Sequence, residues 1–207
     1  GAGSVAAGYS NNANGQNSVA IGSENLSRVA NTIKIGYKNA AKTMGGIAIG
    51  KNNMVDSTNG GTNCAQTRDE NSQIAIGRDN TATHLDTIAI GRDTHATGSG
   101  ATAFGARADA SGNNSIAIGQ SGKDSDRVVA SGVNAIAIGM QSQETGESAI
   151  AEGPGSRAGG KYGVALGLTT KANAEAATAL GNAAEANIAN GVALGSSSVT
   201  TTDKGVV

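Results

Sequence analysis

A short apolar run that ends in glycine recurs at a fixed distance along this chain. Copies read NSVAIG, GGIAIG, SQIAIG, DTIAIG and NSIAIG. The closing glycine, called the marked glycine below, stands at Gly8, Gly22, Gly36, Gly50, Gly77, Gly91, Gly105, Gly119, Gly139, Gly153, Gly167, Gly181 and Gly195. Ten of the twelve successive intervals are 14 residues, and the other two are 27 and 20. Such a repeat predicts a solenoid, in which each unit stacks on the next.

Each repeat carries the alternation of two short strands. Positions three and one before the marked glycine (minus three and minus one) hold Ile, Val or Leu in most copies, and minus two is nearly always Ala. After the glycine, plus three and plus five are small, whereas plus two, plus four and plus six are mostly polar. Alternation with period two indicates strands. We therefore predict an all-β fold of stacked strand–turn–strand–turn coils with parallel sheets. The Ala-rich residues 171–189 keep the same spacing and are predicted as strands too.

The packing of such a coil follows from side-chain size. We expect the Ile, Val and Leu positions to face the inside of the coil, against the small residues of plus three and plus five, because large against small fills a narrow gap. Alanine at minus two would then face outward. A row of such small residues predicts a surface that other chains approach closely, and a single thin coil stack is expected to be marginal by itself. The sequence therefore predicts self-association.

The charge balance and the residue types of the chain argue against several classes of function. The chain has 15 basic and 16 acidic residues, a net charge of −1, which argues against nucleic acid or an anionic membrane as partner. No apolar run approaches the ~20 residues of a membrane span. The two histidines, His84 and His95, are not accompanied by other residues at the spacing of a metal site or a catalytic triad. Asp124 and Asp126 have the spacing of calcium ligands, but the remaining ligands of a calcium loop are missing. We expect no enzyme, no cofactor, no metal and no catalytic residue.

The repeated NSVAIG and NSIAIG motifs at a 14-residue period resemble the YadA-like head of trimeric autotransporter adhesins. The resemblance implies a left-handed parallel β-roll with 14-residue coils, assembled as a homotrimer. It implies a head over residues 1–195 and the start of a neck over 196–207. The family's stalk and C-terminal membrane anchor have no counterpart in this sequence, whose first residues already follow the motif, so we expect a piece of a longer protein.

The same resemblance implies a function. It indicates adhesion to host matrix proteins (collagen, fibronectin or laminin) or to cell-surface receptors, autoagglutination and virulence, at the outer membrane of a Gram-negative cell. An ice-binding or purely structural solenoid is the alternative. Irregular polar residues at plus two, four and six argue against ice, and a 14-residue period does not match the six-residue repeats of solenoid acyltransferases.

The two long intervals predict insertions, at about residues 51–73 and 120–134. The first holds the single cysteine, Cys64. Either insertion is an adhesive loop or a tolerated surface insertion. The ligand is not given by the sequence. Basic side chains that are candidates to bind it are Arg78 and Arg92, from two GRD motifs one coil apart, and Lys123 and Arg127 in the second insertion. A solvated face in which each Arg neutralises an Asp is the simpler interpretation of the GRD motifs.

Two residues test which strand face lies inside. Lys34 replaces alanine at minus two, and Glu152 replaces the apolar residue at minus one. If minus one faces inward, Glu152 is a buried carboxylate that needs Arg157 or Lys161 as a partner. If minus two faces a threefold axis, three Lys34 side chains meet there.

Overall fold

The computed structural model describes residues 1–56, 72–123 and 126–201. The chain is an all-β parallel β-solenoid of about 13 coils with the predicted spacing of about 14 residues. It forms two compact units, Gly1–Gly105 and Ala106–Val207, which are taken in turn below. None of the described residues belongs to a helix long and apolar enough to cross a membrane.

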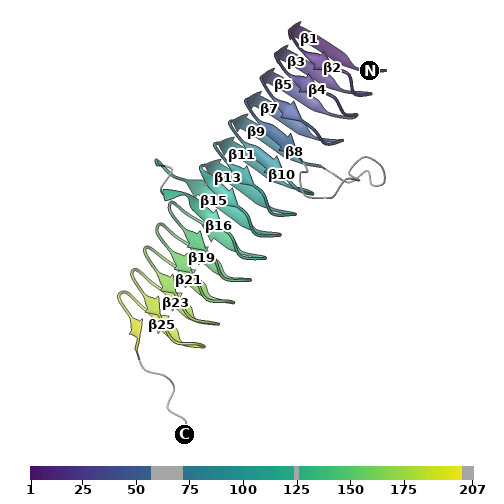
Figure 1. The fold of residues 1–207 in the computed structure, drawn as a ribbon. Coiled ribbons are helices and arrows are strands. Elements are labelled where there is room, and N and C mark those ends of the chain that lie inside the picture. Colours follow the sequence, from purple (N-terminus) through teal and green to yellow (C-terminus); the bar gives the residue numbers. More distant parts are fainter. Residues whose placement is uncertain (57–71, 124–125, 202–207) are drawn as a thin grey trace. The chain divides into compact units, whose positions relative to one another are not determined.

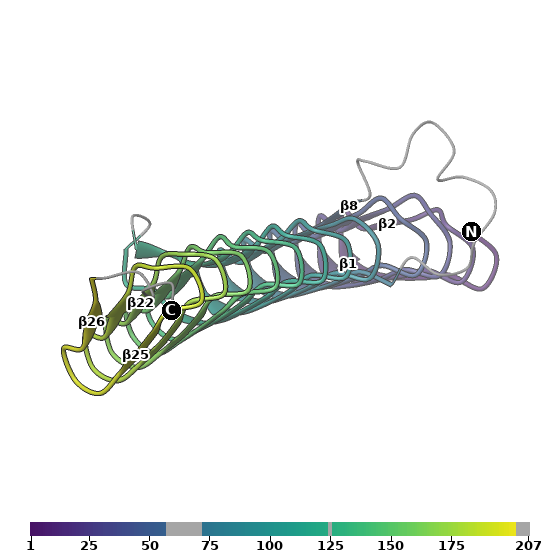
Figure 2. The same cartoon turned by 90° about the horizontal axis from the view of Figure 1, so that it is seen from below.

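Each coil of the first unit has a first strand and a second strand, and like strands of successive coils pair in parallel (Figure 1). The first strands are β1 (Val5–Tyr9), β3 (Val19–Ser23), β5 (Ile33–Tyr37), β7 (Ile47–Lys51), β9 (Ile74–Arg78), β11 (Ile88–Arg92) and β13 (Thr102–Ala106). The second strands are β2 (Asn12–Ala13), β4 (Leu26–Ser27), β6 (Ala40–Ala41), β8 (Met54–Asp56), β10 (Thr81–Thr83) and β12 (His95–Ala96). Figure 2 shows β1 and β2 on opposite sides of the coil stack.

The second unit repeats this plan with shorter first strands. Its first strands are β15 (Ile116–Gln120), β17 (Ile136–Ile138), β19 (Ile150–Glu152), β21 (Val164–Leu166), β23 (Thr178–Leu180) and β25 (Val192–Leu194). Its second strands are β14 (Ala108–Ala110), β16 (Val128–Ala130), β18 (Gln143–Glu144), β20 (Arg157–Ala158), β22 (Lys171–Ala172), β24 (Glu185–Ala186) and β26 (Val199–Thr200). The Ala-rich residues 171–189 lie in β22–β24, which confirms that they are strands.

The marked glycines stack on one another in register, for example Gly22 on Gly36 and Gly36 on Gly50. Gly36 has φ +121°, a conformation that side chains other than glycine rarely adopt. A Cβ built on Gly36 would stand 2.0 Å from the carbonyl oxygen of Gly50. The run therefore ends in glycine because the backbone turns there with positive φ and the next coil leaves no room for a side chain.

The inside of the coils is lined by small side chains from both sheets. Alanine at minus two, as in Ala48 and Ala117, is fully buried, and so is alanine at plus five, as in Ala82 and Ala172. Plus three is buried as well, as predicted, for example Ser156. Two walls of alanine and serine make a thin core, in which little apolar area is removed from water per coil.

A ladder of asparagines runs along plus three in the first unit. Its members are Asn11, Asn25, Asn39, Asn53 and Asn80. The side-chain amide of Asn39 donates to the carbonyl oxygens of Ile35 (3.1 Å) and Gly50 (2.8 Å) and to Oδ1 of Asn25 (3.1 Å). Its own Oδ1 accepts from the backbone and side-chain N–H groups of Asn53. Each buried amide is thereby satisfied, which a buried polar group requires.

Candidate functional site

The largest aliphatic side chains of the repeat lie outside the coils. Residues at minus three and minus one project outward from the first strands, and each is at least partly exposed: Ile21 by 39 %, Ile35 by 39 %, Leu180 by 43 % and Leu194 by 67 %. This surface of the first strands is called the outer apolar face below. Rows of exposed Ile, Val and Leu of this extent mark an interaction surface in soluble proteins.

The predicted orientation of the first strands is therefore wrong. Minus one and minus three face outward and alanine at minus two faces inward, the reverse of the expectation. A coil of 14 residues with two strands and two tight turns holds its sheets so close that alanine and serine already fill the gap. The alternating sequence pattern predicted strands correctly. It did not show which face of each first strand would lie in that gap.

Lys34 is consequently a core residue. Its side chain is fully buried between Ala20 and Ala48 of the neighbouring coils. Its Nζ donates a hydrogen bond of 2.9 Å to Oγ1 of Thr32, which is itself hydrogen-bonded to the hydroxyl of Ser27. Burial lowers the pKa of the Lys34 ammonium to about 8. Ser27 replaces the usual alanine at plus five. The coil that buries a lysine thus also provides the hydroxyl groups of Ser27 and Thr32 beside it.

Glu152 lies on the outer apolar face and is exposed, so the buried carboxylate expected there is absent. Neither proposed partner pairs with it: Lys161 Nζ binds Glu147 Oε2 at 2.9 Å, and Arg157 belongs to the second strand β20.

A fully buried carboxylate does occur, at Glu144, which the sequence reasoning missed. It occupies plus five in β18, between Ala130 and Ala158, with no exposed surface. Neither carboxylate oxygen has a hydrogen bond of good geometry. Burial raises the pKa of Glu144 to about 8, and the backbone N–H groups of Gly132 and Gly146 oppose this only in part. The sequence does contain a signal for this site, because Glu144 stands at plus five, where most repeats have alanine.

The two GRD motifs come together as their spacing predicts. Arg78 and Arg92 are register partners on β9 and β11, and Lys51 is the register partner of Arg78 on the other side. These three basic residues are called the basic row. Arg78 Nε lies 3.4 Å from Oδ2 of its neighbour Asp79, at an exposed position. An exposed pair of this kind contributes little to stability.

The other candidate basic residues belong to the second unit. Lys123 is exposed, and its backbone N–H donates to Oγ of Ser121 at 3.2 Å. Arg127 precedes β16, half-buried and engaged with neighbouring groups. The four candidates thus fall into two separate pairs. Asp124 of the calcium-like spacing lies outside the described residues, as does Cys64 of the first insertion.

The first insertion begins later than its predicted range. Met54–Asp56 is the second strand β8, which pairs with both β6 and β10. Gln73 lies at the other end of the insertion and is buried. It accepts a hydrogen bond from Thr43 Oγ1 (2.6 Å) and donates one to the carbonyl oxygen of His84 (2.8 Å).

The histidines lie in polar surroundings near the surface. His84 Nδ1 is 2.8 Å from the carbonyl oxygen of Thr83, and His95 Nε2 is 3.6 Å from Oδ1 of Asp93. Among the described residues, no three His, Cys, Asp or Glu side chains gather as a metal site would require.

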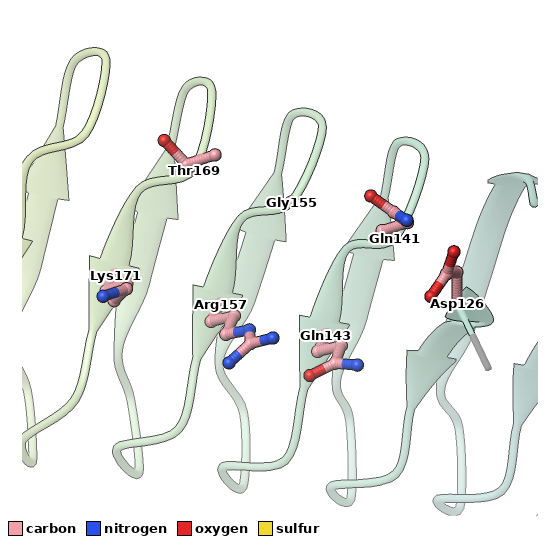
Figure 3. A pocket seen from close by; sticks show the side chains of 7 residues that line it. All are labelled: Asp126, Gln141, Gln143, Gly155, Arg157, Thr169 and Lys171. Atoms are coloured by element: carbon pink, nitrogen blue, oxygen red, sulfur yellow. The ribbon is translucent and has the colours of Figure 1, made fainter.

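A hollow lies on the outward side of the second strands in the second unit. It has a volume of about 390 Å³ and is called the polar groove. Its lining, shown in Figure 3, consists of Asp126, Gln141, Gln143, Gly155, Arg157, Thr169 and Lys171. Gln143, Arg157 and Lys171 of this lining project from the second strands, in the sheet opposite the outer apolar face, whereas Gln141, Gly155 and Thr169 lie in the turns between first and second strands.

A parallel β-solenoid with short coils, glycine-closed first strands and an apolar outer face defines a β-roll. Comparison with protein families matches the YadA head domain repeat to residues 1–25, 74–94, 96–121, 129–143, 145–170 and 172–198, more than half of the chain. The chain therefore belongs to the YadA head family, whose members are trimeric, surface-exposed bacterial adhesins. No curated protein matches the chain.

Proposed function

We propose that this chain forms the head of a homotrimeric adhesin that attaches a bacterium to host extracellular matrix or to host cells. The observation that carries the proposal is the outer apolar face. Burying an Ile, Val or Leu side chain contributes roughly 1.5–3 kcal/mol, and each coil presents up to two of them to water. The thin alanine core buries little apolar surface. Association through the outer apolar face would bury the larger Ile, Val and Leu side chains and so stabilise the assembly.

Assembly through the outer apolar face leaves the second strands as the outward surface of the trimer. Their outward residues, which are exposed or half-buried, vary from coil to coil, for example His95, Asp109, Gln143 and Arg157. A long variable surface, present three times, binds through many weak contacts multiplied by avidity. Collagen, fibronectin and laminin are the proposed ligands. Arg78, Arg92, Lys123 and Arg127 are proposed contributors, and contact between heads would give autoagglutination.

We further propose that residues 1–195 act as the head and 196–207 lead into a neck, with a stalk and an outer-membrane anchor beyond. On this proposal the head is held away from the surface of a Gram-negative cell and contributes to virulence. The family membership supports the surface location.

The test is a binding panel of immobilised collagen, fibronectin and laminin. Deleting residues 154–181, two whole coils, is expected to weaken binding strongly while keeping the register of the remaining coils. Arg92→Gln is expected to change binding less than twofold. Loss of all binding in Arg92→Gln, with the assembly intact, would contradict distributed adhesion. Absence of binding to every ligand, together with thermal hysteresis, would favour the ice-binding alternative.

A further inference from the structure

The polar groove owes its depth to one glycine. Gln141, Gly155 and Thr169 occupy the same position, plus two, in three successive coils, and all three have left-handed φ values of 61°, 67° and 53°. Gly155 alone has no side chain, so the row is interrupted in the middle. Figure 3 shows Gly155 in this row, with Gln143, Arg157 and Lys171 forming a second row beside it.

Arg157 provides the binding charge of the groove. It is exposed on β20, in register between Gln143 on β18 and Lys171 on β22. Its guanidinium has no ion pair or hydrogen bond with any side chain among the described residues. Lys171 Nζ is shared with Glu185 Oε2 at 3.7 Å. An arginine fork beside a lysine matches the oxygens of a carboxylate or sulfate group.

The rest of the lining fits a ligand rich in hydroxyl groups. Gln141 and Gln143 offer amide donors and acceptors, Thr169 offers a hydroxyl, and Asp126 borders one end. None of the lining residues is aromatic or aliphatic, so the groove has no pocket for the apolar side chains of a peptide.

We propose that the polar groove binds an acidic carbohydrate. Its carboxylate or sulfate group contacts Arg157 and Lys171, and its ring hydroxyls contact Gln141, Gln143 and Thr169. Because Gln143, Arg157 and Lys171 lie in the sheet opposite the outer apolar face, an assembly through that face leaves their side chains accessible. The site is discrete and lies within one unit, so it stands whether or not the chain binds matrix proteins along its length.

The test is isothermal titration of the full chain with four probes. They are a hyaluronan tetrasaccharide (carboxylate only), a chondroitin sulfate tetrasaccharide (carboxylate and sulfate), neutral chitotetraose, and a hexaglutamate peptide. We expect at least one acidic sugar to bind about tenfold more tightly than chitotetraose and than the peptide. Preference between the two acidic sugars assigns the anion to carboxylate or sulfate.

Variants locate the binding. Arg157→Gln is expected to lower the affinity for the acidic sugar at least about tenfold, the size of a charge-assisted contact. Arg28→Gln removes the same charge at an exposed position of the first unit and should leave affinity within twofold. Gly155→Asn fills the hollow. Asparagine tolerates left-handed φ, and a thermal melt near that of the parent shows that the variant folds.

Four results would overturn the proposal: no acidic sugar binds; the peptide binds as tightly as the sugar; Arg28→Gln weakens binding as much as Arg157→Gln; or folded Gly155→Asn binds like the parent. Because these measurements use soluble oligosaccharides, they fail or succeed separately from the matrix-binding panel.

Discussion

In the first unit the residue at plus three is asparagine in five coils, four of them buried, whereas in most coils of the second unit it is alanine, serine or threonine: Ala108, Ser142, Ser156, Thr170 and Ala184. The asparagines bond across three coils, but Ser156 Oγ reaches only the carbonyl oxygen of Gly153 at 2.8 Å. First strands also shorten, from five residues in β3 to three in β21. Thr170 Oγ1 donates to the carbonyl oxygen of Gly181 in the next coil. Side chains at plus three thus bond from coil to coil along a continuous series in the first unit, but only at Thr170 among these residues of the second.

The two units also bury opposite ionisable groups. The first encloses Lys34 with two hydroxyl groups nearby, and the second encloses Glu144 without a well-formed hydrogen bond. Each group stands where most coils have alanine. The coil therefore tolerates a polar residue in its interior. Backbone hydrogen bonds between successive coils, rather than the packing of side chains, hold the two sheets in place.

The largest effect is expected at the marked glycines. Gly36→Ala places a Cβ 2.0 Å from the carbonyl oxygen of Gly50, whereas Gly181→Ala places one 2.7 Å from that of Gly195. We expect Gly36→Ala to cost more than about 4 kcal/mol of unfolding free energy and Gly181→Ala to cost less. Thermal melts measure both. Gly195→Ala is the control, since its Cβ meets only Ser198 Oγ at 3.3 Å. Equal melts for all three variants would show that the positive φ, and not a clash with the next coil, is what requires glycine.

The next effect is the pH dependence contributed by Glu144. Its pKa is raised from 4.5 to about 8 in the folded chain, so the folded state binds more protons between these values. Stability should then fall as pH rises from 4.5 to about 8, by a total on the order of 5 kcal/mol. Glu144→Gln should remove this fall, which denaturant titrations at several pH values detect. If the variant and its parent keep the same pH profile, Glu144 is not buried as described.

Lys34 should act in the opposite direction and at higher pH. Its pKa is lowered from 10.5 to about 8, so the unfolded state binds more protons between pH 8 and 10.5. Stability should rise across that window by about 3 kcal/mol. Lys34→Met keeps the volume, removes the charge and should abolish the rise, as measured by the same titrations. A rise that persists in Lys34→Met would have to come from another group.

The smallest effects separate the two kinds of plus-three residue. Asn39→Ala removes the contacts of its amide N–H groups with Ile35, Gly50 and Asn25 and leaves the backbone N–H of Asn53 without its acceptor, which should cost about 2 kcal/mol. Ser156→Ala removes one bond and should cost about 1 kcal/mol. Urea unfolding compares the two variants. A cost for Ser156→Ala as large as that for Asn39→Ala would remove the distinction between the units.

Particular residues show how far the sequence could predict this fold. The marked glycines fixed the coil length, and the register of Arg78 with Arg92 followed from it. Which face of the first strand lies inside did not follow, because alternation is symmetric and alanine is small enough for either side. Lys34 and Glu152 carried the missing information: a lysine surrounded by serine and threonine fits the interior, and an unpartnered glutamate fits the outside.

The polar groove was beyond prediction for a different reason. Gly155, Arg157 and Lys171 each look ordinary in their own repeat. The groove exists only because coil stacking places Gly155 between Gln141 and Thr169. Aligned repeats place these residues at equivalent positions, but the hollow that the missing side chain of Gly155 opens beside Arg157 is visible only in the folded chain.

The orientation of the first strands is tested most directly by sedimentation equilibrium of the parent chain and of Ile116→Asn/Ile118→Asn, a pair on the outer apolar face. If the residues at minus one and minus three face outward and form the assembly, the measured mass of the parent should be three times the chain mass of 20.1 kDa. The double variant should stay folded and dissociate towards single chains. A parent that sediments as one chain, or a double variant that unfolds as a core substitution does, would contradict the account.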